Sequence, residues 1–152
     1  MPITPNSSNA RRHFQEWMRA KVDERMQAAI EMLDRAGLEA TREMRTGRRY
    51  TDRTGNLRSS TGYAVVMDGR IVRGGHFTAV TPKGAEGKKT GEDLVREAAH
   101  EIGHGSLALV LVAGMKYAYY VERMGLNVTD SGVQVARQEV DAMARELGFE
   151  LT

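Results

Sequence analysis

One apolar stripe of unusual length constrains the fold of this chain more than any other feature. Apolar side chains recur every three or four residues from position 14 to position 44, which is the spacing of one helix face. Ser8 or Asn9 can cap such a helix and Gly47 can end it, so we predict a helix over residues 9–46. The stripe comprises Phe14, Trp17, Met18, Val22, Met26, Ala29, Ile30 and Leu33 and continues through Gly37, Ala40 and Met44.

A helix of this length is too long for its own domain to cover. The chain has 152 residues, enough for a single domain with one core. A small sheet in such a domain cannot bury the whole stripe, and large exposed apolar surfaces usually mark contacts with other proteins. We therefore expect part of the helix to meet another subunit.

A polar stretch, residues 50–63, joins this helix to the remainder of the chain. It contains the pair Gly55-Asn56, which readily adopts left-handed backbone conformations, and a single apolar plug at Leu57. We interpret the stretch as a turn of definite shape that connects the helix to a sheet.

The residues after the turn predict a small antiparallel sheet and a closing helix. Two β-rich runs, 63–67 and 70–73, flank an Asp-Gly pair, which is a strong hairpin signal. The most apolar run, 107–113, predicts a central strand, and 117–122 predicts a strand or a short helix. A last helix ends at Gly148 and has a stripe of Ala136, Val140, Met143 and Leu147.

Residues 74–106 differ from their surroundings and are interpreted as an insertion into the sheet. They are rich in glycine, and we expect a flexible tip at 83–91 followed by a short helix at 91–102. The predicted fold class is thus α+β: a long N-terminal helix, a small antiparallel sheet of three to four strands with a loop-rich insertion, and a C-terminal helix. We expect residues 1–8 to form a polar arm and residues 9–152 to form a single domain.

Composition argues against several classes of protein. The chain has no cysteine, so neither a disulfide framework nor a thiolate metal site is possible. A formal net charge of +2 does not suggest a dedicated nucleic-acid binder. No apolar run approaches the roughly 20 residues of a membrane helix, and no apolar leader begins the chain. We expect a soluble protein that is made inside the cell and has no membrane partner.

Arginines gather at the end of the long helix and in the turn. The favoured interpretation is a solvated helix end, where cations also suit the helix dipole. The alternative is a patch that faces nucleic acid or an acidic partner. The candidates for such a patch are Arg45, Arg48, Arg49 and Arg53.

Residues 100–104 read H-E-I-G-H and match the zinc-peptidase motif H-E-x-x-H. In that motif two histidines one helical turn apart bind zinc and the glutamate activates a water. Here glycines at 103 and 105 place the motif at a helix end, and no third ligand follows at the usual spacing. We favour two partly exposed histidines, no cofactor and no enzyme. The alternative hypothesis is a small zinc metallopeptidase with His100 and His104 as ligands and Glu101 as the base.

A third hypothesis is a module that binds nucleic acid. It would use the arginine cluster together with Tyr117, Tyr119 and Tyr120, whose rings can stack on bases. Aromatic residues at this spacing more often belong to a core and an interface, and that is the interpretation we favour.

Two segments together resemble a known family. The first, 54–60, reads T-G-N-L-R-S-S and leads into the hairpin; the second, 114–122, reads G-M-K-Y-A-Y-Y-V-E and follows the predicted central strand. In this order, between a long first helix and a last helix, they resemble the head–tail joining or tail-completion (neck) proteins of long-tailed bacteriophages. The matching residues are Thr54, Gly55, Leu57, Arg58, Ser60, Tyr117, Ala118, Tyr120, Val121 and Glu122.

This resemblance implies a structural role in a virion or in a prophage-derived particle. Copies of the chain, made in the host cytoplasm, would assemble as a ring at the neck of the particle. The ring's partners would be the portal or head-closure proteins on one side and the tail-terminator or tail-tube proteins on the other. DNA would pass through the ring, and Arg45, Arg48, Arg49 and Arg53 would face the DNA channel or an acidic portal surface.

Overall fold

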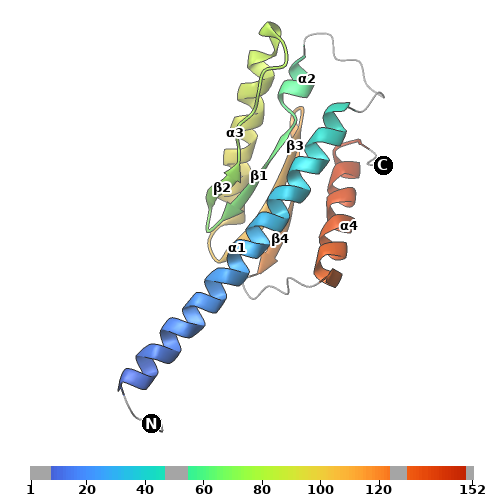
Figure 1. Ribbon diagram of the computed structural model, residues 1–152. Coiled ribbons are helices and arrows are strands. Elements are labelled where there is room, and N and C mark those ends of the chain that lie inside the picture. Colours follow the sequence, from blue (N-terminus) through green and yellow to red (C-terminus); the bar gives the residue numbers. More distant parts are fainter. Residues whose placement is uncertain (1–7, 47–54, 124–129, 150–152) are drawn as a thin grey trace.

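A computed structural model of the protein describes residues 8–46, 55–123 and 130–149 (Figure 1). The predicted arm lies outside these ranges except for Ser8, which begins the first helix. The elements in chain order are α1 (Ser8–Thr46), α2 (Asn56–Ser59), β1 (Gly62–Met67), β2 (Arg70–Gly74), the short 3-10 helix η1 (Pro82–Gly84), α3 (Ala85–Ile102), β3 (Ser106–Ala113), β4 (Lys116–Arg123) and α4 (Asp130–Glu146).

The strands form one antiparallel sheet in the order β2-β1-β3-β4. The α+β fold class is therefore confirmed, and the ambiguous segment 117–122 belongs to a strand. At the β1–β2 turn, Asp68 and Gly69 both have positive φ, 53° and 77°, as the predicted two-residue hairpin requires. The Asp68 carboxylate also accepts a hydrogen bond of 2.7 Å from the backbone N–H of Gly105.

Helices cover both faces of the sheet, which produces two apolar cores. Helices α1 and α4 pack on one face and α3 packs on the other (Figure 1). Strand β3 contributes to both: Leu109 and Leu111 lie in the first core, and Val110 and Val112 lie in the second. Burial on both faces explains why this segment is the most apolar run of the chain.

Only the second half of α1 packs on the domain. Its buried positions begin at Ala29 and continue to Met44. Residues 8–25, here called the projecting segment, extend beyond the sheet in Figure 1 and leave Phe14 62% and Trp17 54% exposed. At 1.5 Å per residue, the projecting segment is about 27 Å long. The expectation that the domain cannot cover the whole stripe is confirmed, whereas contact with another subunit stays a prediction.

The predicted flexible tip at 83–91 is instead mostly helical, because α3 begins at Ala85. The glycines that suggested a loop are points of close packing. A Cβ at Gly87 would lie 2.1 Å from the carbonyl oxygen of Asn56, and one at Gly91 would lie 2.5 Å from the ring of Phe77. Only glycine lets α3 approach α2 and the segment before η1 this closely.

Candidate functional site

The turn after α1 contains a compact network of hydrogen bonds. Gly55 has the left-handed conformation expected of it, with φ of 78°, and α2 forms a single helical turn after it. The Ser60 hydroxyl donates to the carbonyl of Leu57 over 2.8 Å and accepts from the backbone N–H of Gly114 over 2.9 Å. The Thr61 hydroxyl donates to the same Leu57 carbonyl over 2.8 Å. We call residues 55–61 the joint.

Side chains of the joint also hold segments distant in sequence. The Asn56 carboxamide oxygen accepts from the N–H of Gly87 at the start of α3, over 3.0 Å. The Ser59 hydroxyl accepts from the N–H of Val80, also over 3.0 Å. The joint therefore connects α3, the segment before η1 and the β3–β4 turn. The hydroxyl groups of the joint thus hold these segments together, a role that the sequence alone did not predict.

The structure brings the described part of segment 54–60 into contact with segment 114–122. Ser60, from the first segment, is hydrogen-bonded to Gly114, from the second. The side chain of Leu57 packs under the same turn, since a Cβ at Gly114 would lie 3.4 Å from Leu57 Cδ1. Arg58 is exposed beside them. Thr54 lies outside the described residues.

The second segment leads into the edge strand β4, where its side chains alternate between the two faces of the sheet. Ala118 and Tyr120 pack in the core shared with α1 and α4, whereas Tyr117 packs toward α3. Tyr119 and Val121, which follow Tyr117 in alternation on the α3 side, are 40% and 39% exposed. The side chain of Glu122 lies outside the described part of the structure.

The arginine candidates are only partly described. Arg45 is half-buried, and its guanidinium donates two hydrogen bonds, of 2.8 and 3.2 Å, to the carbonyl of Thr61. This arginine thus fastens α1 to the joint within its own chain. Arg48, Arg49 and Arg53 lie outside the described residues.

The H-E-x-x-H motif does not have the geometry of a zinc-binding helix. Helix α3 ends at Ile102, and Gly103, with φ of 70° and ψ of −164°, turns the chain before His104. The two histidines are therefore not one turn apart on a single helix, and both are exposed. Within the described ranges, no three His, Asp or Glu side chains gather as a metal site would require.

Glu101, the glutamate of this motif, interacts with a tyrosine instead. Hydrogen bonding to Glu101, followed by some burial and the charges of Glu101 and Glu97, raises the pKa of Tyr117 to about 12. A carboxylate engaged in this way links the end of α3 to β4.

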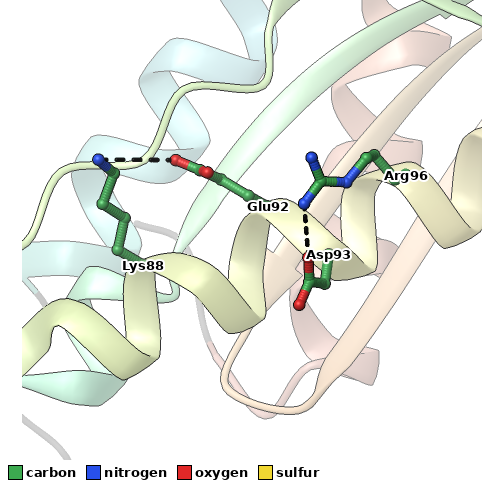
Figure 2. Close-up of polar contacts among 4 residues, drawn as sticks. All are labelled: Lys88, Glu92, Asp93 and Arg96. Carbon is green, nitrogen blue, oxygen red and sulfur yellow. Dashed lines mark hydrogen bonds and ion pairs between the residues drawn. The ribbon is translucent and has the colours of Figure 1, made fainter.

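An acidic row on α3 borders the exposed tyrosine of β4. Asp93, Glu97 and Glu101 are spaced four residues apart, so they lie on one side of the helix, and all three are exposed. Figure 2 shows the ion pairs along α3: Arg96 pairs with Asp93, and Lys88 pairs with Glu92. Among the described residues, no cation pairs with Glu97 or Glu101. We call the surface formed by Glu97, Glu101, Tyr117, Tyr119 and Val121 the α3–β4 face.

Sequence reasoning missed the α3–β4 face. The four-residue spacing of the acidic row was visible in the sequence, but its first member, Asp93, lay near the boundary of a predicted loop. Their position beside β4 depends on how α3 crosses the sheet, for which the sequence has no local signal.

The projecting segment has an unusual distribution of charge. Lys21 and Arg25 follow Trp17 at intervals of four residues, so both cations lie on the apolar side of the helix. Arg11 lies one turn before Phe14 on the same side. Lys21 forms only an exposed ion pair, of 3.4 Å, with Glu24 at the flank.

Two of the three carboxylates of the projecting segment lie away from its apolar side, and the third, Glu24, lies at the flank of that side. Glu16 lies two residues from both Phe14 and Met18, a spacing that places it on the opposite side of the helix, and Asp23 follows seven residues later on that side. The rings of Phe14 and Trp17 stack with their centroids 6.3 Å apart. The apolar side therefore presents aromatic and aliphatic groups together with cations.

Comparison of the chain with protein-family models, with curated proteins and with solved structures found no match. None of the helices in the described ranges combines the length and the apolar character that crossing a membrane requires.

Proposed function

We propose that this chain is a non-enzymatic structural protein of a phage or prophage-derived particle, joining head to tail as a ring at the neck. One observation carries the proposal: the two segments that resemble neck proteins meet at Ser60 and Gly114, in the order and on the elements that the resemblance implies. The partners would be the portal or head-closure proteins and the tail-terminator or tail-tube proteins. DNA would contact the ring only in passing.

The surface of the domain supports an assembly role. A joint with many internal hydrogen bonds holds the sheet and α3 together, while half of a long amphipathic helix extends away with its aromatic side chains exposed. Aromatic residues and arginine dominate the energetics of protein interfaces. A projecting helix of this composition suits a protein whose main interactions are with neighbouring subunits.

The experiment is deletion of the gene from the phage or prophage that encodes it. Electron micrographs of the lysate should then show filled heads and separate tails, and expression of the intact chain from a plasmid should restore joined particles. Normal joined particles in the deletion lysate would overturn the proposal. Portal, capsid and tail genes beside the gene would be the corresponding expectation for the genome.

The DNA-facing role proposed for the arginines now rests on Arg48, Arg49 and Arg53, because Arg45 is bound to Thr61. Charge reversal at these three positions should reduce assembly or DNA retention in the particles. Unchanged assembly and retention would remove this part of the proposal and leave the joining role in place.

The alternative, a zinc metallopeptidase, predicts stoichiometric zinc in the purified protein and its loss in His100→Ala. The end of α3 at Ile102 argues against it, since His104 then lies beyond the helix. Metal analysis of the wild type and of this variant separates the two functions.

A further inference from the structure

We propose that the projecting segment of one copy docks on the α3–β4 face of a second copy, so that each contact between copies pairs two different surfaces of the chain. This inference rests on the proposed ring and specifies which surfaces form it. The projecting segment supplies Phe14, Trp17, Met18 and Val22 with Lys21 and Arg25. The α3–β4 face supplies Tyr119 and Val121 with Glu97 and Glu101.

Charge complementarity is the first argument. The apolar side of the projecting segment carries Lys21 and Arg25, with a single carboxylate, Glu24, at its flank, so a partner that combines apolar and acidic groups suits it. The α3–β4 face has this combination, with Tyr119 and Val121 exposed beside carboxylates that no described cation neutralises. Opposite charges around an apolar contact set both the specificity and the rate of association.

The N-terminal end of α1 supplies a second argument. The first turn of this helix contains no acidic residue, and Arg11 and Arg12 lie close to its positive end. Cations at this end of a helix are unfavourable, because they add to the positive end of the helix dipole. An acidic partner surface would compensate for them, whereas an apolar or basic one would not.

The contact has to be made between copies. Helix α1 is continuous from Ser8 to Thr46 and packs on one face of the sheet, whereas α3 packs on the other. As Figure 1 shows, the projecting segment extends away from the domain and does not lie over its own α3. Two different surfaces of the chain are then paired, and such a heterologous contact produces a closed ring or an open chain of subunits.

A charge-swap experiment tests this pairing. In one variant, Lys21→Glu and Arg25→Glu make the projecting segment acidic while the α3–β4 face stays acidic. In the other, Glu97→Lys and Glu101→Lys make the face basic while the segment stays basic. Each variant should remain monomeric in light scattering at concentrations where the wild type assembles, because like charges meet at every contact.

Mixing the two variants should restore assembly. Each segment then meets a face of opposite charge on the other variant, and subunits of the two kinds alternate. The matched control, Asp23→Lys with Glu16→Lys, reverses charge on the far side of the same segment and should assemble like the wild type. Circular dichroism of each variant checks that the fold is retained.

Cross-linking gives an independent readout, since the chain has no cysteine of its own. An equal mixture of the Arg25→Cys and Glu97→Cys variants, treated with a short bismaleimide, should yield a covalent dimer. Asp23→Cys in place of Arg25→Cys should yield much less. These cysteines sit at the flanks of the contact, so the apolar residues between them are unchanged.

Two results would overturn the inference. One is a wild type that stays monomeric at the highest soluble concentration. The other is a charge-reversed variant that still assembles as the wild type does, which would leave a ring possible but place its interface elsewhere. A deletion phage with normally joined particles would instead contradict the proposed function. The contact between the projecting segment and the α3–β4 face of another copy could still be observed in that case, so the two failures are distinguishable.

Discussion

The hydroxyl of Tyr63 donates a hydrogen bond of 2.6 Å to the carboxylate of Asp34, joining β1 to α1 across 29 residues of sequence. The ring of Tyr63 lies against Gly37, where an added Cβ would come within 2.4 Å of it. Tyr63→Phe should lower the free energy of unfolding by about 1.5 kcal/mol, because the carboxylate loses a partner. Urea denaturation measures this. Asp34→Asn keeps an acceptor oxygen and should cost less.

The same hydrogen bond makes stability depend on alkaline pH. Burial, the bond to Asp34 and its negative charge raise the pKa of Tyr63 to about 12, above the usual value of 10.0. The contribution of this group is therefore complete below pH 10 and is lost as the pH rises from about 10 to 12, where the unfolded chain releases the proton more readily. Urea denaturation at pH 9 and at pH 11 should show a smaller decrease in Tyr63→Phe than in the wild type. An equal decrease would contradict this assignment.

Gly87 and Gly91 should behave unlike ordinary glycines within a helix. Replacing an exposed helical glycine by alanine usually stabilises a protein by about 1 kcal/mol. At Gly87 the new Cβ would meet the backbone oxygen of Asn56 at 2.1 Å, so α3 would have to shift. We expect Gly87→Ala to destabilise by about 2 kcal/mol in thermal or urea unfolding. Lys89→Ala, at an exposed position of the same helix, should change stability little.

These two glycines also show where sequence reasoning reached its limit. A glycine in a loop and a glycine at a close helix contact look the same in the local sequence, so α3 was predicted to start at 91 and starts at Ala85. Long periodic features were predictable because a helix keeps its apolar residues at one spacing, whether that side is buried or exposed: α1 was predicted at 9–46 and spans Ser8–Thr46. The α3–β4 face depends on which elements become neighbours in space, and no periodicity records that.

Ser60 and Thr61 provide a matched pair for testing the joint. Both hydroxyls donate to the Leu57 carbonyl, but only that of Ser60 also accepts from the N–H of Gly114. Ser60→Ala leaves this N–H without its partner and should cost about 2 kcal/mol of stability, whereas Thr61→Val leaves the Leu57 carbonyl bound to Ser60 and should cost less. Equal losses in the two variants, measured by urea unfolding, would mean that the bond to Gly114 contributes little.

Trp17, the single tryptophan of the chain, reports directly on the projecting segment. It is 54% exposed and lies outside the core, so dilute protein should show the red-shifted emission of a solvated indole. Assembly would cover the ring, and emission should shift to the blue and resist acrylamide quenching as concentration rises. Trp17→Ala should leave the unfolding temperature unchanged and weaken association by about tenfold or more, since buried aromatic anchors carry much of the energy of an interface. Glu16→Ala, on the opposite side of the helix, should change neither the unfolding temperature nor the association. Wild-type emission that stays red-shifted at every concentration would show that Trp17 is not part of a contact between copies.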